Sequence, residues 1–425
     1  MKHLTALFLS MCLLGLGNGL GTSLLGIRST IEGFSELEAG LALSGFYVGF
    51  LAGSRLVGNL LANVGHIRVF AGLAALISAV ILAHSLLLSP PVWFILRLAA
   101  GFCMSGIYIT ADSWLNNQVN NHNRGRVLGI YMMMGMGGAA AGQLLIGFAD
   151  PGGFTLFILA SMVFSLSLVP LSLTRIDPPE IPPRKKADIR AVYRAAPLAI
   201  VGAAAAGFTQ GAVLTMGPVY GTEVGLTSSE VGWMMSTLML GSVAMIPLGR
   251  LSDRIPRRRV ILAVTIGAIG LCLIMSIGPV DPALLAGVML AYGALIFPVY
   301  ALAMSHMNDL LERSQLVPGM AALVTFMALG AIAGPVMISA MMTLLGPDGM
   351  WMSLAVVHSL FAVYIVNRFL RRPHIPLAFQ RVFVPITMRS SARVAYLIRG
   401  SRKRKKNRQG GGHPPVVQPR RVHWE

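Results

Sequence analysis

One stretch decides the fold expected for this chain: Gly249-Arg-Leu-Ser-Asp253-Arg254-Ile-Pro-Arg257-Arg258-Arg259. It is a strongly basic segment with one acid, and it lies between two long apolar segments. A divergent copy starts 191 residues earlier, at Gly58-Asn-Leu60-Leu-Ala62-Asn63-Val-Gly65-His66-Ile-Arg68. The two copies indicate that the chain contains one membrane unit twice.

Composition and apolar runs predict a membrane protein. Hydrophobic residues make up 55% of the chain and charged residues 12%, whereas soluble domains contain roughly 25% charged residues. An apolar run of about twenty residues crosses a ~30 Å hydrocarbon layer as a helix. We expect twelve such helices, near residues 4–27, 37–61, 69–88, 92–117, 127–149, 153–173, 198–220, 229–249, 260–278, 283–305, 319–345 and 350–370. The first run resembles a signal peptide, but eleven spans follow and no cleavage site is clear, so we interpret it as a retained helix.

The net charge of +18 is concentrated on one side of the expected membrane. Of the 34 Lys and Arg residues, Arg28 alone falls on an expected outer loop, Arg55 and Arg97 fall inside helices, and the others fall on inner loops or termini. Half of the 16 acids fall on outer loops: Glu32, Glu36, Glu38, Asp150, Glu223, Glu230, Asp281 and Asp348. Both termini are therefore expected to be cytoplasmic. This scattered placement over separate loops also argues against nucleic acid as a partner, and the three cysteines, all inside spans, imply neither disulfide nor metal site.

The repeat extends beyond the basic loop, at an offset near 192 residues. Ser35-x-x-Glu38 matches Thr227-x-x-Glu230, and each pattern predicts a capping box that opens a helix at the outer surface. Further matched pairs are Asn18 with Gln210, Tyr108 with Tyr300, Ala111 with Ala303, Ser113 with Ser305, Asn116 with Asn308, Gly138 with Gly330, and Gly142 with Gly334. Two duplicated six-helix halves are a transporter architecture in which the substrate lies between the halves near mid-membrane.

The pattern Gly-x-Leu-x-Asp-Arg-x-x-Arg-Arg closely resembles the signature loop of the major facilitator superfamily, which joins helices 2 and 3 and again helices 8 and 9. The resemblance covers residues 1–372 and implies an all-α membrane protein with twelve transmembrane helices in two pseudo-symmetric six-helix bundles. The expected parts are a first bundle at 1–174, a cytoplasmic linker at 175–197, a second bundle at 198–372 and a basic tail at 373–425. The string Asp112-Ser113-Trp114-Leu115-Asn116 resembles the YcaD-like bacterial branch and names no substrate.

Helix 4 carries two charges at membrane depth, Arg97 and Asp112. A charge there costs roughly 2.5–3.5 kcal/mol on insertion scales, so it normally faces a partner or a watery cavity. At 100° per residue these two side chains share a polar stripe about 28 Å long. Its members are Arg97, Gly101, Ser105, Tyr108, Asp112 and Asn116. The resemblance implies that helices 1, 4, 7 and 10 line the cavity, and Arg97-x-x-x-Gly101 resembles a helix-4 motif associated with proton coupling.

Both charges have an alternative interpretation. Asp112 is either a titrating or substrate-binding carboxylate, or the partner of Arg55 in an ion pair that holds helices 2 and 4 together. For Arg97 we favour a role in the cavity over a structural hydrogen bond to backbone carbonyls. Their counterparts in the second half are neutral, Met289 and Met304, so the charged face is on one side only.

Amides and phenols supply the other substrate-binding candidates. Asn18 and Gln210 occupy equivalent places on helices 1 and 7, where they bind either a solute or a neighbouring helix through a hydrogen bond worth about 0.6 kcal/mol. Tyr300 and Asn308 repeat Tyr108 and Asn116 on helix 10. Gln143 lies in a glycine-rich helix 5, which resembles the motif of exporters in this superfamily. The alternative is helix packing through small residues.

A charge cluster is expected at the inner end of the second half. Its members are Asp253, Arg254, Arg257 and Asp309, which we interpret as an inner gate. Their counterparts in the first half are Ala62, Asn63, His66 and Asn117, which cannot form the same pairs. This departure from the superfamily pattern leaves the first half without the expected charge relay.

The tail mixes apolar residues with arginines over 373–400 and is nearly all basic over 402–408. Such a segment suits anionic lipid of the inner leaflet, at about 1 kcal/mol per basic residue near the surface. The alternative is a solvated tail. We expect residues 373–408 to carry the lipid contact.

The sequence as a whole predicts a secondary active transporter of a small organic solute, driven by protons through alternating access, with export favoured over uptake. It contains no nucleotide-binding loop, haem motif or metal cluster, so we expect no enzyme activity and no cofactor. The expected location is a bacterial inner membrane, and the expected state is a monomer. A proton-driven uptake symporter, or a receptor or scaffold that kept the fold and lost transport, are the alternatives.

Overall fold

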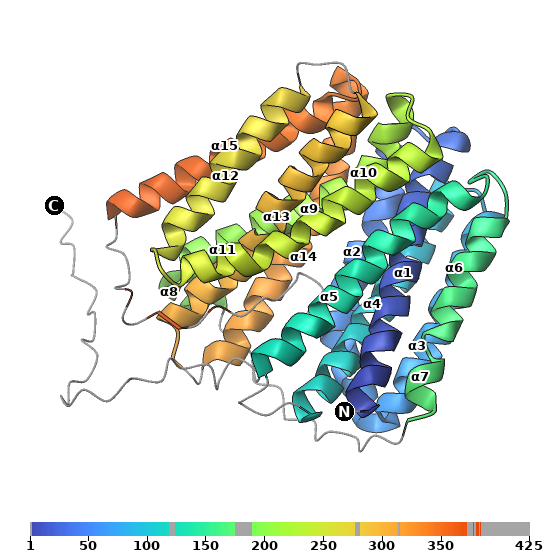
Figure 1. The fold of residues 1–425 in the computed structure, drawn as a ribbon, viewed down its shortest axis with the longest axis horizontal. Coiled ribbons are helices and arrows are strands. Elements are labelled where there is room, and N and C mark those ends of the chain that lie inside the picture. Colours follow the sequence, from blue (N-terminus) through green and yellow to red (C-terminus); the bar gives the residue numbers. More distant parts are fainter. Residues whose placement is uncertain are drawn as a thin grey trace.

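In the structure, a computed structural model, the described part of the protein consists almost entirely of α-helices (Figure 1). The structure describes residues 2–118, 124–174, 189–276, 281–312 and 315–371, together with Leu377, Gln380, Arg381 and Phe383 of the tail. Within these residues, 12 helical segments are long and apolar enough to cross a membrane, which confirms the predicted fold and its twelve spans. Residues 175–188 of the expected linker and most of the tail, including 384–425, lie outside the described residues.

The two halves have the same order of spans. The first half contains α1 (Lys2–Ile31), α2 (Glu36–Val64), α3 (His66–Leu86), α4 (Pro90–Gln118), α5 (Arg124–Leu144) continued by η1 (Leu145–Phe148), and α6 (Thr155–Leu166) followed by α7 (Val169–Ser172). A short helix, α8 (Ile189–Ala195), precedes the second half. The second half contains α9 (Pro197–Glu223), α10 (Ser228–Leu240) continued by η2 (Gly241–Ala244) and α11 (Met245–Ser252), α12 (Arg257–Met275), α13 (Pro282–Leu310), α14 (Leu316–Leu345) and α15 (Gly349–Arg371).

The two predicted capping boxes are present and open α2 and α10. The Ser35 hydroxyl accepts from the Glu38 N–H at 3.3 Å, and the Glu38 carboxylate accepts from the Ser35 N–H at 2.9 Å. Thr227 and Glu230 repeat both bonds. The preceding turns also repeat, because each contains a glycine with positive φ, 75° at Gly33 and 83° at Gly225. A side chain at either position would be strained.

Glycines allow the closest helix packing within each half. A Cβ atom on Gly138 would overlap the backbone oxygen of Cys12, so α5 packs directly on the backbone of α1. In the second half Gly330 meets the Ala204 oxygen in the same way, bringing α14 onto α9. Close approach through small residues is the usual packing of membrane helices. The repeat therefore extends from the sequence to the backbone contacts.

The halves lie side by side and touch at one end of the spans (Figure 1). This end carries the 32–35, 149–154, 224–227 and 346–348 loops and is called the acidic end. There, Gly40 packs against Ser339 and Gly147 packs against Ser229. The Thr343 hydroxyl also donates to the Glu36 carboxylate at 3.2 Å. From this end α5 and α10 diverge toward the opposite end, called the basic end, which carries the 253–256 loop (Figure 1).

The outer surface of the bundle is rich in exposed apolar side chains. Leu173 is 82% exposed, Leu344 74% and Leu370 84%, and many other large apolar residues on the spans are exposed as well. An apolar surface of this extent is far larger than the patches tolerated by soluble monomers. It fits a surface that contacts lipid.

Candidate functional site

A cavity with about 620 Å³ of empty space lies between the two halves. Seven helices, four from the first half and three from the second, supply its lining. Its lining residues are Asn18 and Thr22 of α1, Phe46, Tyr47 and Phe50 of α2, Arg97 and Tyr108 of α4, Gln143 of α5, Leu214 and Thr215 of α9, Met239 of α10, and Met327 and Ala328 of α14. Part of this space is open to solvent.

Arg97 is the charged residue among those lining residues. Its side chain is buried, with the residue only 8% exposed, and the guanidinium carbon lies 4.6 Å from the centroid of the Phe46 ring. The Nε atom is buried without a hydrogen-bond partner among the described residues. Arg97 takes part in none of the ion pairs that we describe for these residues, at Arg28 and at Arg257. Arg97 therefore faces the cavity without an acidic partner there.

The wall supplied by the first half is polar. The Gln143 carbonyl oxygen accepts a hydrogen bond from the Ser23 hydroxyl, which leaves the amide NH₂ group as the donor of that side chain. The Thr22 hydroxyl donates to the Asn18 backbone oxygen at 2.7 Å. Ser23 was not predicted from the sequence, because a lone serine in a span has no distinguishing pattern. Asn18 and Gln143 thus come together with Arg97 in one cavity.

The wall supplied by the second half is largely apolar. It consists of Leu214, Met239, Met327 and Ala328, with Thr215 as its hydroxyl. The predicted binding residues of this half lie elsewhere. Gln210 is buried and its amide donates to the Ile296 backbone oxygen at 3.3 Å, which links α9 to α13.

Two more predicted residues of the second half lie away from the cavity lining. Tyr300 and Asn308 are buried on α13, and neither is among the residues that line this cavity. Their binding role therefore stays a prediction, as does that of Gln210. The side chain of Asn116, the counterpart of Asn308, lies outside the described residues.

Asp112 lies on α4 toward the basic end, about 22 Å from Arg97 at 1.5 Å per residue. It is 1% exposed and accepts a hydrogen bond from the Tyr131 hydroxyl of α5 at 2.9 Å. Tyr131 was missed in the sequence because it lies among methionines in a helix with no polar stripe. The ion pair between Asp112 and Arg55 stays a prediction.

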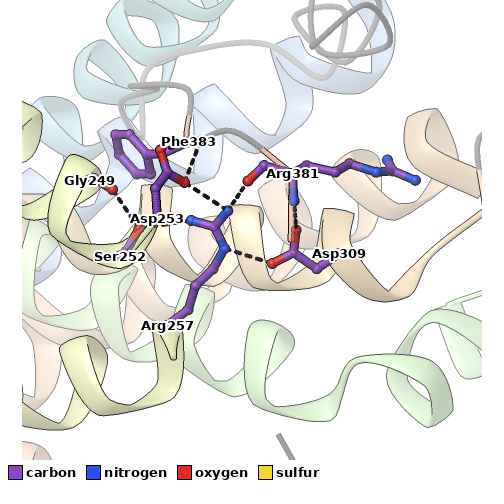
Figure 2. A network of polar contacts seen from close by, with 7 residues as sticks. All are labelled: Gly249, Ser252, Asp253, Arg257, Asp309, Arg381 and Phe383. Carbon is purple, nitrogen blue, oxygen red and sulfur yellow. Dashed lines mark hydrogen bonds and ion pairs between the residues drawn. The ribbon is translucent and has the colours of Figure 1, made fainter. Parts of the chain in front are cut away.

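A second polar site lies at the basic end of the second half, centred on Arg257 (Figure 2). The Arg257 side chain is 1% exposed, and its Nε donates to Asp309 at 2.6 Å. Further bonds reach the Ser252 hydroxyl at 2.8 Å and the Asp253 carboxylate at 3.3 Å. Three of the four predicted gate residues therefore meet. The fourth, Arg254, is exposed and takes part in none of the ion pairs of the described residues.

The tail completes this site, which the sequence did not indicate (Figure 2). The Arg381 N–H donates to Asp309 at 2.7 Å, and the Phe383 N–H donates to Asp253 at 3.0 Å. Arg257 also donates to the Arg381 backbone oxygen. The Phe383 ring packs on Gly249 of the signature loop, where a Cβ atom would overlap it. Both carboxylates are thus held by one guanidinium and by backbone donors of the tail.

The first half has a different contact at the equivalent place. His66, the counterpart of Arg257, has its Nε2 3.0 Å from the Ser113 hydroxyl of α4, and its ring packs near Trp114. The side chain of Asn117 lies outside the described residues. A histidine–serine pair therefore takes the place of the charged network, as the sequence difference predicts.

A cavity between two repeated six-helix halves defines the class of this protein, a multi-pass membrane transporter. A family model described as Major Facilitator Superfamily matches residues 7–227 and 199–398, and the chain belongs to this family of transporters, which are not enzymes. The chain is similar to the uncharacterized MFS-type transporter YcaD of Escherichia fergusonii, with 27% identity over 301 residues, covering 70% of this chain and 78% of the relative. The YcaD protein of Salmonella newport is 27% identical over 304 residues, with the same two coverages of 70% and 78%.

Solved structures share the fold at low identity. The nucleoside transporter NupG has a TM-score of 0.72 at 14% identity and covers 87% of this chain and 98% of its own. The D-xylose-proton symporter has a TM-score of 0.65 at 15% identity, with coverages of 86% and 96%. A bacterial homolog of the human lysosomal transporter Spinster, in an inward-facing and occupied conformation, has a TM-score of 0.67 at 16% identity, with coverages of 86% and 95%. These similarities confirm the fold.

Proposed function

We propose that this protein is a proton-coupled secondary active transporter that exports a small organic solute by alternating access. The observation that carries the proposal is the cavity between the halves. At the acidic end, contacts between the halves separate this cavity from the surroundings on that side of the molecule. By the positive-inside rule the acidic end faces outward. In this arrangement the solute enters from the cytoplasm at the basic end and leaves after the halves rock to the opposite state.

Asp112 is the proposed coupling residue. It is buried on the same helix as Arg97 and lies one helical turn beyond the cavity-lining Tyr108, toward the basic end. Its bond to Tyr131 joins α4 to α5 within the first half, and we infer that the exposure of this pair changes when the halves rock. A buried carboxylate whose partner and exposure change between states is suited to bind and release a proton. Export, rather than uptake, is supported by the glycine-rich α5 that carries Gln143.

The test uses purified protein. A solute screen by thermal shift identifies a ligand, because binding to the folded state stabilises it by mass action. In proteoliposomes a proton gradient should then drive movement of that solute. Asp112→Asn should abolish the gradient-driven movement while exchange of solute down its own gradient persists. An exporter moves the solute against the direction of proton flow, whereas an uptake symporter would move the solute in the same direction as the protons.

The outcome also separates coupling from structure. If Asp112→Asn removes folded protein from the membrane, the carboxylate is a structural partner, and Arg55→Ala should then be equally damaging. Full gradient-driven transport by well-expressed Asp112→Asn protein would refute the coupling role. Absence of any solute movement by stable wild-type protein, with or without a gradient, would favour a receptor or scaffold.

A further inference from the structure

A buried cation faces the cavity without an acid to neutralise it. Arg97 is more than nine-tenths buried, and its Nε has no hydrogen-bond partner among the described residues. The Phe46 ring stabilises the guanidinium in part through its negative face. An aromatic ring does not neutralise a full positive charge, so the buried Arg97 guanidinium would be stabilised further by a bound anion.

The residues around Arg97 are also donors. The Gln143 carbonyl oxygen is occupied by Ser23, so its NH₂ group is the part of that amide left for a bound molecule. The Asn18 amide lines the same polar wall, whereas the Thr22 hydroxyl already donates to the Asn18 backbone oxygen. A guanidinium with adjacent amide donors is the arrangement that recognises a carboxylate, which accepts several hydrogen bonds at once.

The opposite wall defines the rest of the solute. On that wall Leu214, Met239 and Met327 supply apolar and adaptable surface. On the first-half side, Phe50 of α2 adds aromatic surface to that of Phe46. One cation lines the cavity among the described residues, so a second negative charge on the solute would be buried without compensation. A solute with one anionic group and an apolar body fits both walls.

We propose that Arg97 binds the carboxylate of the transported solute, and that the solute is an amphipathic organic monocarboxylate. This inference rests on the proposed transport function and names its substrate class. The carboxylate lies on the first-half wall with Arg97 and Gln143, and the apolar body lies against the second-half wall. Rocking of the halves moves the two walls relative to each other, so release of the body from the second half frees the anion.

Matched pairs of acids and amides test the charge requirement directly. Benzoate, octanoate and indole-3-acetate are compared with benzamide, octanamide and indole-3-acetamide on the purified wild-type protein at pH 7. Each pair has nearly the same shape and differs in charge. We expect at least one acid to raise the thermal midpoint and to bind in calorimetry, while its amide binds about tenfold to a hundredfold more weakly.

Variants then assign the effect to Arg97. Arg97→Gln should weaken binding of that acid by about tenfold or more, and Arg97→Lys should keep part of the affinity because it keeps the charge. Arg250→Gln is the matched control, since Arg250 is exposed on α11 and does not line the cavity. If Arg97→Gln does not fold, the wild-type comparison of acid with amide decides alone.

Three results would overturn the inference: amides that bind as well as their acids, no binding by any of the acids, or unchanged acid affinity in folded Arg97→Gln protein. Transport of a neutral or cationic solute would also overturn it while leaving the proposed transport function intact. Arg97-dependent binding of an acid without gradient-driven movement in proteoliposomes would support this site and contradict the proposed transport function.

Discussion

Asp309→Asn should strongly destabilise the second half of the protein. Asp309 and Arg257 form an ion pair at 2.6 Å in which each side chain is 1% exposed. Removing one charge of such a pair leaves the other buried without full compensation, which costs about 3–5 kcal/mol. Asp253 lies 3.3 Å from Arg257 and is partly exposed, so it replaces little of the lost interaction. We expect a loss in unfolding free energy of about 3 kcal/mol or more.

The assay is chemical denaturation of purified protein in micelles, read by tryptophan fluorescence. Glu312→Gln is the matched control, because Glu312 is an exposed acid three residues from Asp309 and should change the free energy of unfolding by less than about 0.5 kcal/mol. Truncation after Arg371 removes the backbone donor of Arg381 that binds Asp309. In a double-mutant cycle, Asp309→Asn and the truncation should therefore be coupled by about 1 kcal/mol or more.

Two results would refute this reasoning. A loss below about 1 kcal/mol for folded Asp309→Asn protein would show that the pair is solvated and not buried. Strict additivity of Asp309→Asn and the truncation would show that the tail does not bind the carboxylate. The second result would remove the tail from the description of the basic end.

Three further predictions concern topology, packing and gating. A cysteine at Asp348 should react with an impermeant thiol reagent from outside the cell and one at Arg254 only from inside; the reverse pattern would invert the proposed orientation. Gly138→Ala should lower the unfolding free energy by at least about 1 kcal/mol through overlap with the α1 backbone, whereas Gly137→Ala, which faces open space, should change it far less; equal effects would contradict the α1–α5 packing. Asp253→Asn should shift the population toward states open at the basic end, and an unchanged distance distribution between the halves in spin-label measurements would rule this out.

Features that depend on nearby residues could be predicted from the sequence. The spans follow from apolar length, and the capping boxes at Ser35 and Thr227 follow from a serine or threonine three residues before a glutamate. The repeat followed from side-chain identities at one offset. The structure adds the turn glycines Gly33 and Gly225 to this repeat, because a positive φ favours glycine in both copies.

The site could be predicted only in part, because the two halves have diverged where they face the cavity. Helical periodicity placed Arg97 and Asp112 on one stripe, but the cavity reaches Arg97 and leaves Asp112 at a different depth. The sequence matched Asn18 with Gln210, yet only Asn18 lines the cavity, while Gln210 bonds to Ile296 of a neighbouring helix. A polar side chain in a span points either to a cavity or to another helix, and its own sequence cannot distinguish the two.

The sequence by itself determined that the protein is a duplicated membrane bundle of the transporter type, because apolar length, charge placement and repeat spacing are local or strictly periodic signals. Only the tertiary structure decided which groups meet across long separations. It placed Gln143 beside Ser23, and it brought Arg381 of the tail to Asp309. The physical reason is that these contacts depend on how whole helices pack and where the chain returns, and backbone donors such as the Arg381 N–H have no side-chain signature.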